Sequence, residues 1–404
     1  MTQALSSSAA ASAGTPPPPD ARPAAPLSAA KSPSSAGLEG VVAAKSEICF
    51  IDGIAGRLVY RGYEIGDLVE NAGFEEVAYL LWDGKLPNQS ELAQLKKDIA
   101  VNMALPEHVS KLLADLPGKM QPMDALRTAC SALAAVDSDL TSNEPDANRR
   151  KAIRLTAQFP TIITAFHRLR SSQKPIAPDP SLSIAGNFLY MLTGKKPHET
   201  LTRVMDAALV LHAEHGMNAS TFAARVTAAT LADMHAAVTA ALAALKGPLH
   251  GGANQDVMEL LLQCGEPAEA EKKVEQMLND GKKVPGFGHR VYKTFDPRAT
   301  FLRNMSKQLG EAAKNSKWYE MSEKLIPIVK TMKNKDPNVD FFSASAYYTM
   351  GIPLDLFTPI FAIARVTGWT AHIMEQHKNN RIIRPTDDYV GPFDLKVEPI
   401  DRRM

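Results

Sequence analysis

Apolar residues recur at a helical period through most of this chain. From residue 65 onward they return every three or four positions, which is the spacing of one face of an α-helix. Glycine, proline, aspartate and asparagine separate these segments, and such residues begin or end helices. The pattern predicts helices at residues 65–71, 74–82, 90–102, 107–116, 124–136, 148–169, 183–193, 199–215, 220–245, 254–264, 269–280, 297–314, 318–332, 341–350 and 358–377. We therefore expect an all-α fold.

The strand pattern is confined to residues 46–63. Two short apolar runs lie there on either side of Asp52-Gly53 and Gly56, which predicts one small β-hairpin. A chain with so little strand excludes the sheet-based cofactor folds. Gly286-Phe287-Gly288 follows no strand and lacks the third glycine of a dinucleotide-binding motif, and no phosphate-binding P-loop sequence occurs.

Residues 1–37 differ from the rest of the chain. They are mostly Ala, Ser and Pro with few bulky apolar side chains, so they cannot bury enough surface to offset the entropy of ordering. We expect this segment to be disordered. It lacks the basic start and apolar core of a secretory signal, and with Arg22 as its only arginine it is a poor mitochondrial presequence. These features favour a cytoplasmic location.

Composition and charge fit a soluble globular protein. The chain has 404 residues, 45% of them hydrophobic, and a formal net charge of +1, so it has no general attraction to nucleic acid or to an anionic membrane. The most apolar run, residues 236–245, is too short to span a bilayer. Three widely spaced cysteines, Cys49, Cys130 and Cys264, argue for a reducing compartment and against a disulfide framework or a cysteine-based zinc site.

The segment KGPLHGGAN at residues 246–254 places His250 on a bend between two helices. Gly247-Pro248 ends the first helix, because the residue before a proline avoids the α region. Gly251 and Gly252 follow the histidine and would let the backbone approach a ligand closely. An imidazole on such a bend can point into a cleft, although a plain helix–helix turn would look the same.

Three further segments concentrate reactive side chains. In LHAEHGMNAS, His212 and His215 are three residues apart, which would place both on one helix face. In NVDFFSA, Asp340 stands where a helix begins and is predicted to be its N-cap. The remaining candidates are basic or imidazole side chains in PGFGHRVYKTFDPR and near the C-terminus, namely His289, Arg290, Lys293, Arg298, Arg365 and Arg384.

Other functions fit some of these residues taken one by one. His212, Glu214 and His215 could belong to a metal-dependent hydrolase, although no HExxH motif and no nearby cysteine supports a metal site. A non-catalytic helical scaffold would need Asp340 only as a helix cap. A chelator and an Asp340→Asn variant would separate both alternatives from an enzyme that uses no metal.

Together the motifs resemble the citrate synthase family. GPLHGGAN, PGFGHRVY…DPR and NVDFFSA occur in the order of that family, as do IDGIAGRLVYRGYEI near the start and LHAEHGMNAS. LFTPIFAIARVTGWTAHIMEQ and RPTDDYVGP match further signature regions. The resemblance extends from about residue 38 to the C-terminus.

The resemblance implies a role for each candidate. Asp340 matches the carboxylate that removes a methyl proton from the acetyl thioester, His250 the donor to the thioester oxygen, and His289 the group that polarises the keto carbonyl of oxaloacetate. The remaining matches are residues that bind oxaloacetate, His215, Arg298, Arg365 and Arg384, and residues near the coenzyme A phosphates, Arg290 and Lys293.

The resemblance also implies an architecture and partners. A large helical domain (38–250 and 351–404) and a smaller helical domain (251–350) would enclose the site, and a homodimer would share Arg384 across subunits. Acetyl-CoA and oxaloacetate are the implied substrates, with no cofactor and no metal. The close alternative is a 2-methylcitrate synthase that uses propionyl-CoA. Gly216 and the run Thr386-Asp387-Asp388 depart from the residues common in the family.

The chemistry makes demands that these residues can meet. A carbon next to a thioester is a very weak acid, so a carboxylate needs hydrogen-bond donors where charge develops on the oxygen. We expect the donor histidine to be neutral, because neighbouring arginines oppose a second positive charge. Two or more arginines suit a dicarboxylate. A helix start at Asp340 would weaken it as a base, whereas burial would restore its basicity.

Overall fold

The computed structural model describes residues 36–38 and 40–403. The chain divides into two compact units, one ending at Lys45 and one beginning at Ser46, and each is described by itself. In the first unit, Ala36–Leu38 form a single 3₁₀ turn. The predicted disorder of residues 1–37 concerns mainly residues 1–35, which lie outside the described part of the chain. All the predicted site residues belong to the second unit.

The second unit begins with a small antiparallel sheet. Its strands are β1 (Cys49–Asp52), β2 (Arg57–Tyr60) and β3 (Tyr63–Glu64), in that order across the sheet. The Asp52 carboxylate fixes the β1–β2 turn, because it accepts hydrogen bonds of 2.9 Å from the backbone N–H groups of Ile54 and Ala55. The predicted hairpin is thus confirmed, and β3 is an addition that the sequence pattern did not indicate.

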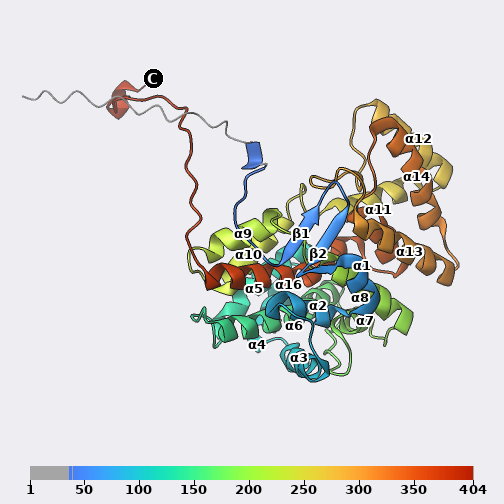
Figure 1. Cartoon of the computed structure of the whole chain (residues 1–404), viewed down its shortest axis with the longest axis horizontal. Coiled ribbons are helices and arrows are strands. Elements are labelled where there is room, and N and C mark those ends of the chain that lie inside the picture. Colours follow the sequence, from blue (N-terminus) through green and yellow to red (C-terminus); the bar gives the residue numbers. More distant parts are fainter. Residues whose placement is uncertain (1–35, 39, 404) are drawn as a thin grey trace, which may run out of the picture. The chain divides into compact units, whose positions relative to one another are not determined.

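The rest of the unit is helical, as predicted. Figure 1 shows the helices packed around one another, with the short sheet at one side of them. Those before residue 250 are α1 (Ile65–Asn71), α2 (Phe74–Asp83), α3 (Gln89–Asn102), α4 (Glu107–Asp115), α5 (Pro122–Leu133), α6 (Pro145–Arg170), α7 (Ile184–Thr193), α8 (Glu199–His212), α9 (Ala219–Ala228) and α10 (Met234–Leu245). Those after it are α11 (Ala253–Cys264), α12 (Pro267–Asn279), α13 (Pro297–Ala312), α14 (Lys317–Lys333), α15 (Val339–Thr349) and α16 (Phe357–Lys378).

One predicted helix is wrong: residues 220–245 form two helices, α9 and α10. Leu231 between them has a left-handed backbone (φ 64°), which no helix can continue through. Asp233 then caps the second helix, since its side chain accepts a hydrogen bond from the N–H of Ala236 at 3.0 Å. The two helices pack against each other as a tight pair.

Helix α16 lies at the centre of the molecule. Every residue from Phe357 to Ile373 is buried, and the helix packs against α2, α6, α8, α9 and α10. A helix that is apolar on all sides belongs in a core. Arg365 and His372 are therefore exceptional in this helix, because buried charged or polar side chains need partners or a function.

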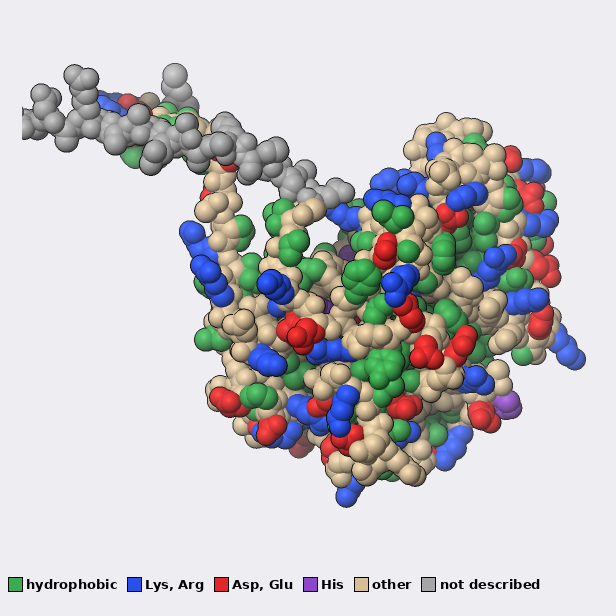
Figure 2. All heavy atoms as spheres, viewed as in Figure 1, with side chains coloured by type: hydrophobic (Ala, Val, Ile, Leu, Met, Phe, Trp, Pro, Cys, Tyr) green, Lys and Arg blue, Asp and Glu red, His purple; other side chains and the backbone are tan. Residues whose placement is uncertain are grey.

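The helices after residue 250 form a group of their own. Helix α13 packs mainly on α15, and α12 on α14, whereas α11 contacts both this group and α16. Figure 1 shows α11 to α14, in yellow and orange, gathered at one side of the earlier helices. On the face in Figure 2, acidic and basic side chains are interspersed, in keeping with a net charge of +1.

Candidate active site

His215 lies in the loop after α8. The helix ends at His212, so the predicted placement of both histidines on one helix face is wrong. His215 is buried, and its Nε2 lies 3.1 Å from the hydroxyl of Tyr292. Its ring also meets the ring of His289 edge to face, with centroids 5.1 Å apart. The loop after α8 is thus joined to the segment that carries His289.

His250 is held by the start of helix α9. The backbone N–H of Ser220 donates to Nε2 of His250 at 3.3 Å, and the Ser220 hydroxyl lies 2.8 Å from the same nitrogen. Because a backbone N–H can only donate, Nε2 is the acceptor and Nδ1 carries the proton. Trp369 from α16 donates to the Ser220 hydroxyl at 3.0 Å. The ring is therefore fixed with an N–H that can be offered to a ligand.

Of the two glycines after His250, only Gly251 is required by the packing of the turn. A Cβ on Gly251 would lie 2.4 Å from the carbonyl oxygen of Leu245, which is far closer than atoms can approach. A Cβ on Gly252 would meet nothing within 4 Å. Gly251 therefore lets the turn fold back onto the end of α10, a packing role that the sequence did not indicate.

His289 is oriented by its own loop. Its Nδ1 accepts from the backbone N–H of Val291 at 3.0 Å, with the N–H of Tyr292 at 3.3 Å. Nε2 therefore carries the proton and can donate. The side chain is half-buried, so the ring remains within reach of a ligand.

Asp296 connects Arg298 to the start of helix α15. Its carboxylate accepts from Nε and NH2 of Arg298 at 2.9 and 2.8 Å, and from the backbone N–H of Val339 at 3.1 Å. Burial opposes the charges, but the pairing raises the pKa of Arg298 and lowers that of Asp296. Arg298 is thus a permanent buried cation fixed beside the helix that carries Asp340.

Asp340 is not the N-cap that the sequence predicted. Asn338 caps α15, since its side-chain oxygen accepts from the N–H of Asp340 at 3.0 Å. Asn338 also donates to the carbonyl of Gly288 at 2.9 Å, next to His289. Asp340 is the second residue of the helix, so its carboxyl does not accept the capping bond and remains available for other contacts.

Burial raises the pKa of Asp340 to about 6. The charge of Arg298 lowers it and that of Asp296 raises it, but desolvation has the largest effect. The helix start was expected to weaken this carboxylate as a base. The effect of burial on the pKa is larger than that of the helix start. It leaves Asp340 with a pKa close to that of an effective general base at neutral pH.

Arg365 is a buried guanidinium with one unpartnered nitrogen. Its Nε donates to the carbonyl of His212 at 2.8 Å, and its plane lies 4.6 Å from the centroid of Phe361. The NH2 nitrogen has no hydrogen-bond partner, although it is buried. The same holds for Nε2 of His212, whose ring meets Phe361 edge to face. Such orphaned polar atoms cluster where a polar ligand binds.

These contacts bring the predicted residues into one region. The His215–His289 ring contact and the Tyr292 hydroxyl connect the α8 loop to the His289 loop. Phe361 lies between Arg365 and His250, whose ring centroid is 6.5 Å from its own. The charge of Arg365 acts on Asp340 and on His250 alike. Segments as far apart in sequence as His212 and Arg365, which are separated by 153 positions, therefore meet in one region.

The histidines of the site are neutral near pH 7. Burial lowers the pKa of His250 and of His289 to about 4, and the nearby charges of Arg365 and Arg298, respectively, lower each further. Burial and Arg298 also hold the pKa of His215 well below its ordinary value. The low pKa of His250 agrees with the expected neutral imidazole, and burial lowers that pKa more than the charge of Arg365 does.

Three predicted residues lie outside this cluster. Arg384 is exposed in the irregular segment after α16, and no hydrogen bond or ion pair among the described residues joins it to the site. Arg290 and Lys293 are exposed on the His289 loop, where Nζ of Lys293 donates to the carbonyl of Arg290 at 3.2 Å. These two are near His289 in the chain but face solvent.

Some residues of the site were not predicted. Ser220 orients His250, Tyr292 contacts His215, and Asp296 holds Arg298. Asp296 was interpreted only as the N-cap of the following helix, a role it also has, because its Oδ1 accepts from the N–H of Arg298 at 3.1 Å. No local pattern indicates its contact with the backbone of Val339, because the two residues are 43 positions apart.

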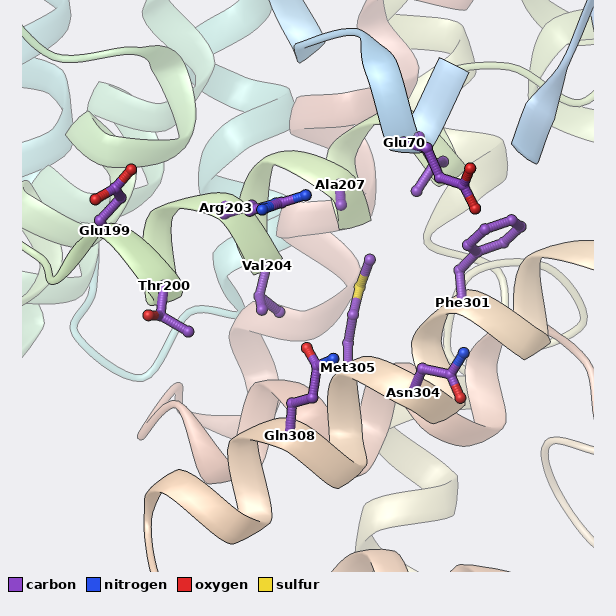
Figure 3. Close-up of a pocket in the computed structure, with 11 residues that line it drawn as sticks. Glu70, Glu199, Thr200, Arg203, Val204, Ala207, Phe301, Asn304, Met305 and Gln308 are labelled. Carbon is purple, nitrogen blue, oxygen red and sulfur yellow. The ribbon is translucent and has the colours of Figure 1, made fainter. Parts of the chain in front are cut away.

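Two cavities among the described residues lie apart from this cluster. One of about 400 Å³ follows α8 and α13, and Figure 3 shows Arg203 and Val204 from the first helix facing Phe301 and Met305 from the second. Another of about 200 Å³ lies beside the turn at Pro248. None of the predicted site residues lines either cavity. The site is therefore defined by contacts among its side chains.

Comparison with known proteins gives the family. The model of "Citrate synthase, C-terminal domain" matches residues 37–386. "Citrate synthase 2" of Bacillus subtilis (strain 168) is 50% identical over 368 residues, which cover 91% of this chain and 98% of that protein. "2-methylcitrate synthase" of Shewanella oneidensis is 43% identical over 378 residues, covering 93% and 100%. The chain belongs to the citrate synthase family.

A solved structure extends the likeness to three dimensions. Citrate synthase of Thermoplasma acidophilum, in a ternary complex with carboxymethyl coenzyme A and oxaloacetate, superimposes with a TM-score of 0.86 at 35% identity, covering 91% of this chain and 99% of that one. The chain is thus an enzyme of the citrate synthase family with that family's mostly helical fold. The predictions of family, fold class and enzymatic nature are confirmed.

Two features of the described residues bear on the alternative functions. No group of three or more His, Cys, Asp or Glu side chains in this part of the chain is arranged to hold a metal ion. Glu214 instead lies 3.0 Å from Nε2 of His372, and His212 bonds to the carbonyl of Ala208. Among the same residues, no helix has the length and apolar character to cross a membrane.

Proposed function

We propose that this chain is a citrate synthase that condenses acetyl-CoA with oxaloacetate and hydrolyses the resulting citryl thioester. The observation that carries the proposal is the meeting of a half-buried carboxyl, Asp340, with neutral histidines and buried guanidiniums from four other segments. The relatives include a citrate synthase and a 2-methylcitrate synthase. They support the reaction class, but they do not distinguish acetyl-CoA from propionyl-CoA as the acyl donor.

In this proposal Asp340 is the base. With a pKa near 6 it is ionised at neutral pH yet still a better proton acceptor than an ordinary aspartate. It removes a proton from the methyl group of the thioester, and the electron pair moves to the thioester oxygen. His250 donates its Nδ1–H to that oxygen, because Ser220 occupies its Nε2.

The second substrate would be held beside this enolate. His289 donates its Nε2–H to the keto oxygen of oxaloacetate, which makes the keto carbon more electrophilic. The carboxylates of oxaloacetate lie against His215, Arg298 and Arg365, whose unpartnered NH2 group then gains an acceptor. The enolate carbon attacks the keto carbon, and water afterwards cleaves the thioester.

Two domains suit this order of events. Residues 38–250 with 351–404 would form a large domain and residues 251–350 a small one, a division supported by the separate packing of α12 to α15. Asp340, His289 and Arg298 belong to the small domain, whereas His250, His215 and Arg365 belong to the large one. Closure would bring the base to its substrate and exclude water until the carbon–carbon bond has formed.

A homodimer would complete the site through Arg384. The segment after α16 supports this proposal, because it carries apolar side chains with no cover in the single chain: Val390 is 92% exposed and Val397 87%. Arg290 and Lys293, exposed beside His289, would contact the phosphates of coenzyme A. The proposal requires no cofactor, involves neither nucleic acid nor a membrane, and expects a cytoplasmic enzyme.

Thiol release tests this function. Purified protein is given acetyl-CoA with and without oxaloacetate, and release of coenzyme A is followed with a thiol reagent. We expect release only when both are present, and we expect a chelator to leave the rate unchanged. Release without oxaloacetate, or loss of activity with the chelator, would contradict the proposed reaction.

The same assay with propionyl-CoA tests the acyl group. One additional methylene is worth roughly 1–3 kcal/mol of discrimination, which corresponds to roughly 10- to 200-fold in kcat/KM. We expect kcat/KM for acetyl-CoA to be the higher of the two at saturating oxaloacetate. A higher value for propionyl-CoA would identify a 2-methylcitrate synthase, the second candidate function, which the relative from Shewanella oneidensis favours.

A further inference from the structure

We propose that Glu214 is a positioning residue that sets the charge of the dicarboxylate site, weakening the hold of Arg365 on its ligand so that the product can leave. The inference rests on the proposed function, because it assigns the ligand of Arg365 to oxaloacetate. Glu214 is fully buried, stands one residue before His215, and was not among the predicted substrate-binding residues.

The carboxylate of Glu214 lies against the face of α16 that bears Arg365. A Cβ on Gly368 would come within 2.2 Å of its Oε2, so only a glycine leaves room for it there. Arg365 and His372 are three residues before and four after Gly368, on the same face of the helix. The carboxylate therefore lies between the guanidinium and the imidazole.

His372 does not neutralise Glu214. Arg225 donates from NH1 to Nδ1 of His372 at 3.1 Å, and an arginine has no acceptor, so this nitrogen keeps its lone pair. His372 is therefore neutral and donates its Nε2–H to Oε1 of Glu214 at 3.0 Å. The hydrogen bond orients the carboxylate while its negative charge remains.

The charge of Glu214 acts on Arg365. Its Oε2 is buried without a hydrogen-bond partner, and so is NH2 of Arg365. Burial lowers the pKa of Arg365, and Glu214 is the charge that most opposes this effect. Among the described residues, no ion pair within 4 Å joins Glu214 and Arg365. The NH2 group of Arg365 is therefore available to a ligand, while the negative charge of Glu214 partly offsets the positive charge of the guanidinium.

The balance matters because the product carries more charge than the substrate. Oxaloacetate is a dianion and citrate a trianion at neutral pH, so an uncompensated site with two buried arginines would hold the product more tightly than the substrate. Arg298 already has Asp296 as its counter-charge. Glu214 supplies the corresponding charge for Arg365, at a distance that leaves the guanidinium available.

Substitution Glu214→Gln tests this role. Glutamine keeps the bond from His372 and removes only the charge, so the site becomes more positive. We expect KM for oxaloacetate and the inhibition constant of citrate to fall roughly three- to tenfold, as the loss of one nearby charge predicts, while KM for the acyl thioester stays unchanged. A structural role alone would weaken substrate binding, and an unchanged or raised KM for oxaloacetate overturns the proposal.

Two variants serve as controls. Asp83→Asn also removes one carboxylate charge, but Asp83 pairs with Arg149 at 3.0 Å, in a pair that includes none of Glu214, His372 and Arg225, so both constants should stay at wild-type values. Glu214→Asp keeps the negative charge, so KM for oxaloacetate and the inhibition constant of citrate should be closer to wild-type values in this variant than in Glu214→Gln. If Glu214→Gln does not fold, the double variant Glu214→Met, His372→Leu replaces the polar pair with an apolar one and carries the same prediction.

The experiment also separates this inference from the proposed function. Wild-type protein that releases no thiol from acetyl-CoA or propionyl-CoA in the presence of oxaloacetate refutes the function itself. Active wild-type protein whose Glu214→Gln variant binds oxaloacetate and citrate no more tightly refutes only the role of Glu214.

Discussion

The carboxyl of Asp340 lies in surroundings that disfavour its charge, and this property can be tested in three ways. Asp340→Asn keeps the shape of the side chain and removes the base. We expect kcat to fall by roughly 10²–10⁴-fold, the usual contribution of a general base, with KM for oxaloacetate little changed. The measurement is thiol release under saturating substrates.

A nearby aspartate provides the control for this substitution. Asp336 is four residues earlier in the chain and pairs with Lys330 at 2.7 Å at the surface. Asp336→Asn should leave kcat within about twofold of wild type, since exposed ion pairs contribute little. Equal losses in the two variants would show that disturbance of the segment, and not loss of a base, lowers the rate.

The pH dependence of the rate follows from the same carboxyl. Asp340 must be ionised to accept a proton, and its pKa is raised to about 6. We expect kcat/KM for the acyl thioester to fall as the pH drops through about 6, along a limb that reports one proton. His250 and His289, each with a pKa of about 4, stay neutral over this range. A midpoint near 4 would contradict the assignment of Asp340 as the base.

The raised pKa also has a cost in stability. A carboxyl whose folded-state pKa exceeds its unfolded value stabilises the fold fully below the unfolded value, and this stability is lost as the pH rises through the folded pKa. At pH 7 the ionised Asp340 therefore destabilises the protein. Asp340→Asn should raise the free energy of unfolding at pH 7 by up to about 3 kcal/mol, since the pKa is raised from 3.8 to about 6, with the gain vanishing below pH 4.

Thermal unfolding of both proteins at pH 4 and pH 7 measures this effect. A variant that is inactive and yet more stable at pH 7 would show that the fold tolerates an unfavourable charge for the sake of catalysis. A variant less stable than wild type at pH 7 would mean that ionised Asp340 makes favourable contacts that outweigh its desolvation.

At the scale of single residues, the sequence pointed to the proposed reacting groups more clearly than to the residues that support them. His250, His289 and Asp340 stand in distinctive motifs, so their resemblance to the family was visible. Their supports, Ser220 and Asn338, are polar residues at helix starts, where a capping role is the ordinary interpretation. Their contacts to distant residues depend on the fold and leave no local pattern.

At the scale of helices, the turn that carries His250 depends on Gly251. A side chain there would collide with the carbonyl of Leu245, at 2.4 Å, so the turn must move away from the end of α10. We expect Gly251→Ala to lower the free energy of unfolding by about 1–3 kcal/mol, as overpacking usually does, and to lower kcat because His250 moves with the turn.

The neighbouring glycine is a matched control. Gly252 has φ −89°, which any residue adopts, and a Cβ would meet nothing within 4 Å. Gly252→Ala should therefore leave the stability within about 0.5 kcal/mol of wild type. Thermal unfolding and thiol release, measured on both variants, test whether the contact with Leu245 requires glycine at position 251. Similar stability losses at 251 and 252 would rule out the contact with Leu245 as the cause.

Helix boundaries were largely predictable because proline, glycine and capping residues mark them. The division of residues 220–245 into α9 and α10 was not, since the break contains neither glycine nor proline and Leu231 takes the left-handed conformation that favours glycine. The early end of α8 at His212 was missed for a related reason. Ala213, Glu214 and His215 can all continue a helix, and glycine first appears at residue 216.

At the scale of the whole molecule, the proposed dimer gives the sharpest test, because Arg384 would act in a site to which its own chain does not contribute the base. The segment after α16 leaves the packed core, and Arg384 is exposed there. Arg384→Ala alone should raise KM for oxaloacetate strongly, since one carboxylate contact is lost. That result would not say which subunit supplies the arginine.

Mixed dimers answer that question. Asp340→Asn and Arg384→Ala chains are each expected to be nearly inactive alone. In a dimer of one with the other, the site built on the Arg384→Ala chain keeps its own Asp340 and receives Arg384 from the Asp340→Asn chain, so it is complete. Equal mixing after unfolding and refolding should give about a quarter of wild-type activity, because half the dimers are mixed and half their sites are intact. If Arg384 instead serves its own chain, no site in the mixture is complete and activity stays at the level of the separate variants.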